Sequence, residues 1–193
     1  MTISRLWQTI RLCLIRGDYK RGEYLRRKGI FAYMGENVAI TDRKVPLYAN
    51  LIKIHNNVLL ASNVTLAAHD GSYAVLRHAH PECAFQEQIG CIEIMDNVFI
   101  GAGTTVLGGV RIGPNAIIGA GSLVNRDIPP NSVAAGKPAR VVGSFDDFAA
   151  KKQAKYYPDE LAPVNQTVSA ELAELMWKEF DSARSEEHRP AGG

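Results

Sequence analysis

Three of the five histidines in this sequence fall in one short polar stretch. His69, His78 and His80 lie there, whereas His55 sits in a regular repeat and His188 near the end of the chain. An imidazole group titrates near pH 6.5, so it accepts and returns a proton at neutral pH. The stretch therefore holds the candidates for a general base.

Two further polar features belong to the same stretch. Asp70 directly follows His69 and is a candidate to orient the imidazole, as carboxylates do in acyl-transfer sites. Adjacent side chains seldom face each other, so an Asx turn beside Gly71 is an equal alternative. Cys13, Cys83 and Cys91 lack metal-ligand spacing, and neither a disulfide framework nor a metal site is expected.

The elements that must position these groups follow a period of six. Between residues 94 and 128, apolar or small residues recur every sixth position in two series, all at even numbers: Ile94, Ile100, Val106, Ile112, Ile118 and Val124, and Val98, Thr104, Val110, Ala116, Ser122 and Ile128. A helix of 3.6 residues per turn does not present such positions on one face, but short strands do. The repeat predicts an all-β solenoid in which each circuit packs on its neighbours.

Earlier units keep the same phase at residues 34–38, 54–58 and 60–64, whereas residues 41–53 break the spacing. A polar insertion at residues 67–91 interrupts the repeat. Three hexads close one circuit, so residues eighteen apart should lie one above the other. Ala102 is then expected beneath Ala120, and Leu59, Phe99 and Ile117 in one outward-facing apolar column.

Helices are expected at both ends of the chain. Ile3, Trp7, Ile10 and Leu14 recur at helical spacing in residues 3–16, and this face is expected to cover the open first circuit. Contact with an anionic membrane surface is the less favoured alternative for this basic helix. Residues 145–157 and 169–183 read as two more helices, the second capped by Ser169, with a disordered tail from Ser185.

Composition sets wider limits. A formal net charge of +2 over 193 residues gives no strong attraction to nucleic acid. No stretch approaches the roughly 20 apolar residues of a membrane span, and no signal peptide is expected. A cytoplasmic location is the default prediction.

The hexads, the histidine stretch, and the segments 118–129 (IGAGSLVNRDIP) and 135–140 (AGKPAR) together resemble the hexapeptide-repeat acyltransferases. Within that family the resemblance is strongest to the galactoside, maltose and xenobiotic O-acetyltransferase group, over about residues 34–143. It implies a left-handed parallel β-helix and a homotrimer with active sites between subunits. The expected divisions are an N-terminal helical cap at 1–33, the β-helix at 34–143, and a C-terminal extension and tail at 144–193.

The resemblance also implies roles for individual residues. His69 matches the catalytic histidine, with His78 as runner-up and His80 behind it. Substrate contacts are weaker candidates, at Tyr73, Arg77 and Glu82. Acetyl-coenzyme A is the implied co-substrate, and the positions that match its contacts are Phe99, Gly101, Ala102, Ala120, Asn125, Arg126, Lys137 and Arg140. Backbone amides of the Gly101-Ala102 corner are candidates for the oxyanion donors.

The predicted activity is transfer of an acetyl group from acetyl-coenzyme A to a hydroxyl of a sugar or other saccharide acceptor. Transfer is expected to be direct, in a ternary complex, since no serine or cysteine is paired with a base. Other acceptors remain open: an amino sugar, serine or an antibiotic. Two rival classes are a non-catalytic scaffold and a metal protein of the γ-carbonic-anhydrase type. The latter needs three histidine ligands, and residues 83–187 contain no histidine.

Overall fold

The computed structural model describes residues 3–153, 157–164 and 167–187, which fall into two compact units, Met1–Ala149 and Ala150–Gly193. The first unit contains all the strands of three parallel sheets. The second consists of helical and extended segments and is described separately.

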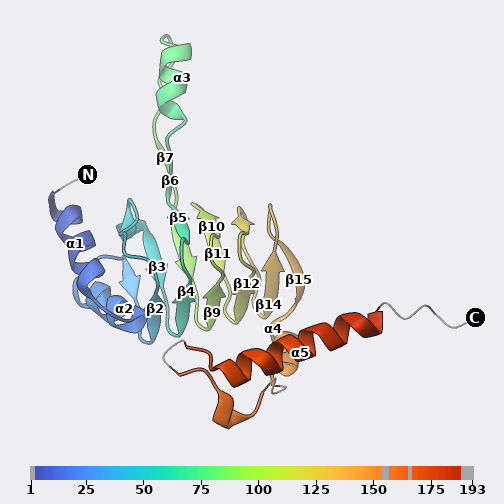
Figure 1. The fold of residues 1–193 in the computed structure, drawn as a ribbon. Helices are drawn as coiled ribbons and strands as arrows, with labels where there is room; N and C mark the ends of the chain where they lie inside the picture. The colour runs from blue at the N-terminus through green and yellow to red at the C-terminus, as the bar shows by residue number, and fades with distance from the viewer. Residues whose placement is uncertain (1–2, 154–156, 165–166, 188–193) are drawn as a thin grey trace, which may run out of the picture. The chain divides into compact units, whose positions relative to one another are not determined.

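The chain passes through the three sheets in a fixed order, and each of the three full circuits between β3 and β13 adds one strand to each sheet (Figure 1). The first sheet contains β1 (Tyr33–Met34), β3 (Ile52–Ile54), β8 (Ile92–Ile94) and β11 (Val110–Ile112). The second contains β2 (Val38–Ile40), β4 (Val58–Leu60), β9 (Val98–Ile100), β12 (Ala116–Ile118), β14 (Ser132–Ala135) and the antiparallel β15 (Arg140–Ser144). The third contains β5 (Thr65–Ala67), β10 (Thr105–Leu107) and β13 (Leu123–Val124).

The strand register confirms the predicted eighteen-residue circuit where the hexads are regular. Val98 pairs with Ala116, and Ile92 pairs with Val110. Leu59, Phe99 and Ile117 also lie in register, as expected. Elsewhere the circuit length changes, because residues 41–53 and the insertion lengthen the earlier circuits and the final step from β12 to β14 is shorter.

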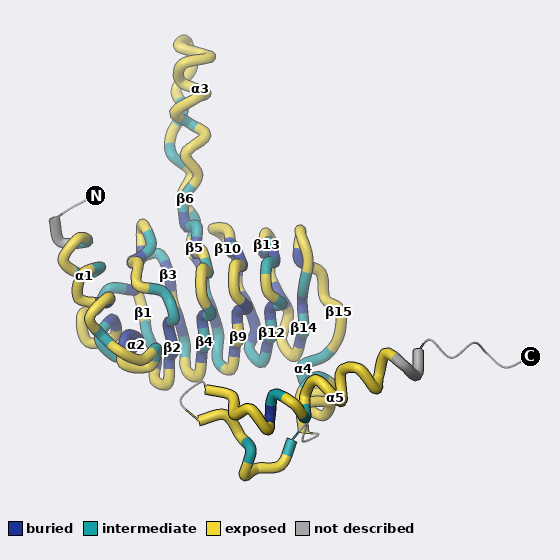
Figure 2. The backbone as a smooth tube through the Cα atoms, in the orientation of Figure 1, coloured by how far each residue is buried: buried dark blue, intermediate teal, exposed yellow. Residues whose placement is uncertain are grey.

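The interior is formed by the even-numbered positions that the repeat singled out (Figure 2). All twelve predicted positions are buried, with exposures of 0–4 %. Each fully buried aliphatic side chain contributes about 1.5–3 kcal/mol relative to an exposed one. Parallel pairing and this shared interior therefore hold the circuits together.

A ladder of asparagines lines the corner between the first and second sheets. Asn37, Asn57, Asn97 and Asn115 all have a positive φ of 53–58°. Each of the first three donates its side-chain amide to the side-chain oxygen of the next at 2.8 Å. Asparagine tolerates this left-handed conformation better than most residues. The ladder thus links the side chains of successive circuits at a corner whose backbone is left-handed.

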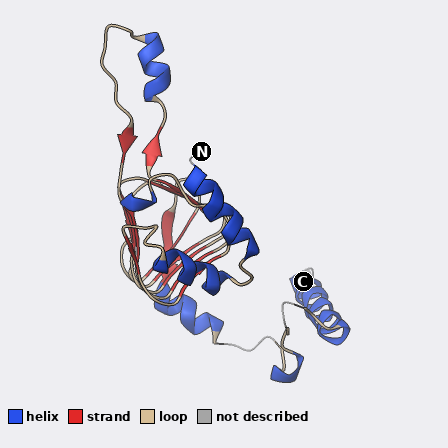
Figure 3. Cartoon of the chain, turned by 90° about the vertical axis from the view of Figure 1, so that its left-hand side faces the viewer, coloured by secondary structure: helices blue, strands red, loops and turns tan. Residues whose placement is uncertain are grey.

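Two helices, α1 (Ile3–Leu14) and α2 (Asp18–Arg27), lie at the end of the coil that begins with β1 (Figure 3). α2 packs against β2, which is an edge strand of its sheet, so closely that a Cβ on Gly22 would lie 1.9 Å from the Val38 carbonyl oxygen. Arg21 is buried and donates from Nε to the Ile40 carbonyl oxygen at 2.8 Å. The Ile40 carbonyl oxygen of this edge strand is thereby satisfied.

The prediction that the apolar face of α1 covers the first circuit is wrong. Trp7, Ile10 and Leu14 are exposed, and the side chain of Ile3 lies outside the described residues. Leu12 is the buried residue of this helix, and Arg5 donates to the Val45 carbonyl oxygen at 2.7 Å. The side of α1 that carries Arg5 and Leu12 therefore faces the first circuit, where the Val45 carbonyl oxygen needs a donor.

The C-terminal helices differ in length from their predicted ranges. α4 (Phe145–Lys152) ends before the predicted residue 157, and residues 154–156 are outside the described part. A short 3-10 helix, η2 (Asp159–Leu161), follows. α5 (Ala170–Glu187) begins at the predicted cap, where Ser169 Oγ accepts the Leu172 amide at 3.1 Å. The tail expected to be disordered from Ser185 is therefore helical to Glu187, and His188 lies outside the described residues.

None of the helices in the described ranges combines the length and apolarity needed to cross a bilayer.

Replacing Asn97 should lower the free energy of unfolding. Alanine removes two ladder hydrogen bonds and adopts the left-handed backbone poorly, which together cost about 2 kcal/mol. Asn97→Gly accepts that backbone and should be about 1 kcal/mol more stable than Asn97→Ala. Denaturant unfolding of the three proteins measures both differences. Equal stability of Asn97→Ala and the original chain would contradict the ladder's role.

Candidate active site

The insertion leaves the three sheets as a narrow arm, which we define as residues 69–89. Its base is an antiparallel pair, β6 (His69–Asp70) and β7 (Gln88–Ile89), in which His69 lies opposite Ile89. Helix α3 (Tyr73–Ala79) forms the far end of the arm, away from the sheets (Figure 1). The first histidine of the stretch is therefore fixed at the base and the other two lie further out.

His69 is half-buried at the point where the arm leaves the third sheet. Its Nδ1 atom is buried and has no hydrogen-bond partner among the described residues. The ring of Tyr48 packs edge-on against the imidazole, with 5.5 Å between ring centroids. A buried ring nitrogen without a partner is costly, so it marks a place where another group is expected to bind.

Asp70 does not orient His69. Its two carboxylate oxygens accept hydrogen bonds from the Ser72 backbone amide at 2.8 Å and the Ser72 hydroxyl at 3.1 Å. Neighbouring residues of a strand point to opposite sides, so the carboxylate faces away from the imidazole. The Asx-turn alternative is the one that the structure contains.

Tyr48 and Glu87 form a link across the base of the arm that was not predicted from the sequence. The Tyr48 hydroxyl donates to Glu87 Oε2 at 2.8 Å, and this hydrogen bond raises the pKa of Tyr48. Tyr48 has a φ of 53°, an uncommon conformation for a bulky residue, and it precedes the 3-10 helix η1 (Ala49–Leu51). The break in hexad spacing at residues 41–53 was the only signal in the sequence.

The remaining candidates on the arm contact other residues of the arm rather than His69. His78 Nδ1 lies 2.6 Å from the Ala74 carbonyl oxygen, and His80 Nδ1 lies 3.4 Å from Glu82 Oε1. Arg77 stacks over the Tyr73 ring at 5.0 Å and donates to the Phe85 carbonyl oxygen. No hydrogen bond, ion pair or ring contact within the described ranges joins His69 to any of the five other candidates on the arm. These are His78, His80 and the substrate candidates Tyr73, Arg77 and Glu82.

His55 is occupied elsewhere. Its Nε2 lies 3.1 Å from Glu93 Oε1, and Arg111 Nε donates to the other carboxylate oxygen at 2.8 Å. The contact with His55, followed by that with Arg111, holds the pKa of Glu93 below its usual range. His55 therefore has Glu93 as its partner and is not a free base.

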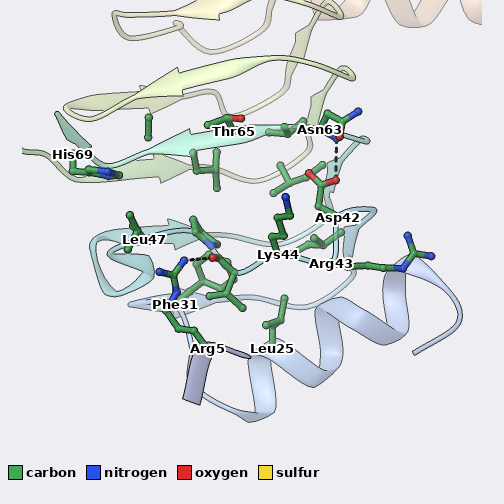
Figure 4. A pocket seen from close by; sticks show the side chains of 17 residues that line it. Arg5, Leu25, Phe31, Asp42, Arg43, Lys44, Leu47, Asn63, Thr65 and His69 are labelled. Carbon is green, nitrogen blue, oxygen red and sulfur yellow. Dashed lines mark hydrogen bonds between the residues drawn. The ribbon is translucent and has the colours of Figure 1, made fainter. Parts of the chain in front are cut away.

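A hollow of about 610 Å³ lies beside His69 (Figure 4). The strand β5 is the edge of the third sheet, and residues 42–47 pass below it without pairing to it. Figure 4 shows His69 at one end of the hollow and Lys44 nearer its middle. A small molecule entering this space would reach the imidazole.

The Gly101 and Ala102 corner stacks on the Ala120 corner as predicted. Gly101 is buried, and a Cβ there would lie 2.5 Å from the Ala120 nitrogen. The Gly101 amide donates to the Ile118 carbonyl oxygen at 2.8 Å, so it is not available as an oxyanion donor. The amides of Ala102 and Ala120 have no acceptor in the described chain, and they are the groups open to a ligand.

The turn that joins β14 to β15 lies next to this corner. The Leu123 amide donates to the Gly136 carbonyl oxygen at 2.9 Å, and the Gly136 amide donates to Ser122 Oγ at 3.2 Å. Lys137 is exposed on this turn, and Arg140 follows it with one bond to the Ala139 carbonyl oxygen. The structure thus brings the Ala120 corner and the predicted terminal basic residues together.

Asn125 and Arg126 are exposed just after β13, at its other end. Arg126, Lys137 and Arg140 form no ion pair with any described residue. All three cations are therefore free to meet an anionic ligand.

His69 and the Ala102 corner occupy opposite ends of the third sheet within one chain. Ala67 pairs with Leu107, so His69 follows the strands of this sheet whereas Ala102 precedes them. The length of the strands β5 and β10 therefore separates His69 from Ala102. Phe99 lies on the second sheet, 37 % exposed, in a hollow of about 240 Å³. One chain alone does not assemble all the predicted site residues in one place.

Comparison with known proteins identifies a family with a hexapeptide repeat, in agreement with the coiled strands described above. The family model "Bacterial transferase hexapeptide (six repeats)" matches residues 92–126. The galactoside O-acetyltransferase of Escherichia coli K12 is 43 % identical over 97 residues, which are 50 % of this chain and 45 % of that protein. The chain spans about half the length of the curated relatives it matches.

Two solved structures share the fold. A maltose O-acetyltransferase from Clostridium difficile 630 superposes with a TM-score of 0.54 at 29 % identity, covering 73 % of this chain and 84 % of that one. A galactoside acetyltransferase in complex with coenzyme A superposes with a TM-score of 0.53 at 27 % identity, covering 81 % and 85 %.

Residues 92–126 therefore carry the hexapeptide repeat that the family model describes. The resemblance of the chain to the hexapeptide-repeat acyltransferases is confirmed, and its relatives include galactoside and maltose O-acetyltransferases.

The Tyr48–Glu87 link should stabilise the base of the arm. Tyr48→Phe keeps the ring against His69 but removes the hydroxyl, which is worth about 1 kcal/mol. Hydrogen exchange of the β6 and β7 amides should then be about fivefold faster. Glu87→Gln retains an acceptor oxygen and should exchange nearly as the original chain does. Unchanged exchange in Tyr48→Phe would show that the link does not hold the arm.

Proposed function

We propose that this chain is an acetyl-coenzyme-A-dependent O-acetyltransferase that acts on a hydroxyl of a sugar or saccharide-type acceptor. The observation that carries the proposal is His69, whose buried Nδ1 lacks a partner in the described chain and whose ring faces a hollow in a hexapeptide-repeat protein. The names of its relatives support acetyl transfer and a galactoside or maltose type of acceptor.

In the proposed reaction the acceptor enters the hollow beside His69. The imidazole removes the proton from the acceptor hydroxyl as its oxygen attacks the thioester carbonyl carbon. The resulting tetrahedral intermediate collapses, the carbon–sulfur bond breaks, and the leaving sulfur takes the proton from the imidazolium. Cys13, Cys83 and Cys91 are exposed, and none of their thiols is hydrogen-bonded to a histidine ring in the described ranges, which favours direct transfer in a ternary complex.

The coenzyme is proposed to lie along the Ala102 and Ala120 corners, where two backbone amides are open. Amides and carbonyls at such a corner suit the peptide-like pantetheine arm. Lys137 and Arg140 would meet the phosphates through charge-assisted hydrogen bonds of about 1.5–3 kcal/mol each. Phe99, Asn125 and Arg126 are proposed as further contacts with the coenzyme. Because the Gly101 amide already has an acceptor, the Ala102 amide is proposed as the oxyanion donor.

We further propose a homotrimer in which each site lies between two copies. His69 and the Ala102 corner lie at opposite ends of the third sheet in one chain, so His69 of one copy would act on a thioester held by the coenzyme corner of the next. Val75 and Ile89 on the arm are exposed by 71 % and 58 %, which suits contact with a neighbouring copy. Such a neighbour would also supply the missing partner of His69 Nδ1.

The proposed architecture is a left-handed parallel β-helix over residues 34–143, with the insertion at 67–91 as an active-site loop. Residues 1–33 are proposed as a helical cap and 144–193 as a C-terminal extension. Since acetyl-coenzyme A is the proposed co-substrate, the cytoplasm is the proposed location.

A release assay for free thiol, run over sugars, amino sugars, serine and antibiotics, tests the activity and its acceptor. His69→Ala should lower kcat at least a hundredfold and leave the affinity for coenzyme A nearly unchanged, because a general base acts in the transition state. His78→Ala is the matched control and should keep ordinary turnover. Ordinary turnover in His69→Ala would remove His69 from the mechanism.

Arg140→Ala should raise the KM for acetyl-coenzyme A about tenfold with little change in kcat, since it removes binding shared by ground and transition states. Lys53→Ala removes an exposed cation from the first sheet and serves as the control. An unchanged KM in Arg140→Ala would reject the phosphate contact.

A further inference from the structure

Helix α1 presents an apolar face to solvent. Its residues recur at helical spacing, and their exposures are 43 % for Leu6, 66 % for Trp7, 42 % for Ile10 and 71 % for Leu14. A single exposed apolar residue is ordinary, but four on one helical face form a patch that indicates a binding surface.

The orientation of this face is fixed by contacts on the other side of the helix. Leu12 has an exposure of 0 %, and Arg5 donates to the Val45 carbonyl oxygen at 2.7 Å. Both contacts lie within the first compact unit. The apolar face is thus held outward by the fold and does not pack on the first circuit.

The surroundings of this face are strongly basic. Helix α1 contains no acidic residue, and residues 1–28 contain eight basic and two acidic residues, although the whole chain has a net charge of only +2. One of the two acids, Glu23, is already paired with Arg26 and Arg27 at 2.8 and 2.7 Å. Arg11, Arg16 and Lys20 are exposed and form no ion pair with a described residue.

We propose that α1 docks in the plane of an anionic phospholipid surface. Leu6, Trp7, Ile10 and Leu14 would enter the interface between headgroups and acyl chains, and the exposed basic residues would lie among the anionic headgroups. An apolar face with tryptophan and leucine, bordered by arginine and lysine, is the pattern of interfacial helices. A second copy of the same surface is a poor occupant, because two such basic regions repel each other.

Docking also has a consequence for the neighbouring hollow. Arg5 of α1 lines the hollow beside His69. A docked α1 therefore holds this hollow near the bilayer. The docking does not depend on the proposed acetyl transfer, so either claim can fail without the other.

The test is flotation of the full chain with vesicles of phosphatidylcholine containing phosphatidylglycerol, compared with pure phosphatidylcholine. Binding should be at least tenfold stronger to the anionic vesicles and should weaken with salt, because surface charges are screened. In Trp177→Ser, Trp7 is the sole tryptophan, and its fluorescence should shift to the blue on binding.

The double variant Trp7→Ser/Ile10→Ser should lose at least tenfold in binding to the anionic vesicles. Trp177→Ser is its matched control, since Trp177 is also an exposed tryptophan on a helix, and it should bind as the original chain does. Both changed residues of the double variant are exposed, so its melting temperature should be unchanged.

Equal binding to neutral and anionic vesicles, no binding to either, or full binding by the double variant would each overturn the proposal. Loss of a self-associated species in the double variant, without vesicle binding by the original chain, would show that a second copy covers the face instead.

Discussion

The structure depends on parallel strand pairing between successive circuits, which buries one set of side chains in a shared interior. Positions such as Ile94, Ile100 and Val106 each have an exposure of 0 %. No strand of three residues could bury such a side chain alone, so each circuit is stable only against its neighbours. The asparagine ladder repeats the same logic at a corner, where each amide is satisfied by the next circuit.

This constraint also decides where chemistry can be placed. One part of the proposed site lies where the repeat is interrupted, and the other lies on regular corners. The irregular residues 41–53 leave the edge of β5 unpaired and open the hollow, while the insertion carries His69. The coenzyme corner, by contrast, is built from the regular part, because stacked small residues leave backbone amides accessible. The proposed site combines an irregular and a regular surface, which one chain presents at different corners.

Local departures from a satisfied fold coincide with the proposed functional surfaces. His69 Nδ1 is buried without a partner, Tyr48 adopts a positive φ, and α1 exposes an apolar face. Each is unfavourable for an isolated chain. A substrate or a neighbouring copy would give His69 Nδ1 a partner, and a membrane would cover the apolar face of α1. The regular circuits hold enough buried apolar surface to tolerate them.

The sequence alone determined the period of the coil, its buried positions, the eighteen-residue circuit and the cap at Ser169, because alternation along a strand and capping at a helix start are local. It also singled out His69 through its place beside the repeat. Tertiary structure decided which face of α1 packs inward, that Asp70 binds Ser72 instead of the imidazole, that the Gly101 amide is already engaged, and that Tyr48 meets Glu87. Most of these outcomes depend on partners distant in the chain, and a repeat pattern says which residues are buried but not which polar groups find each other.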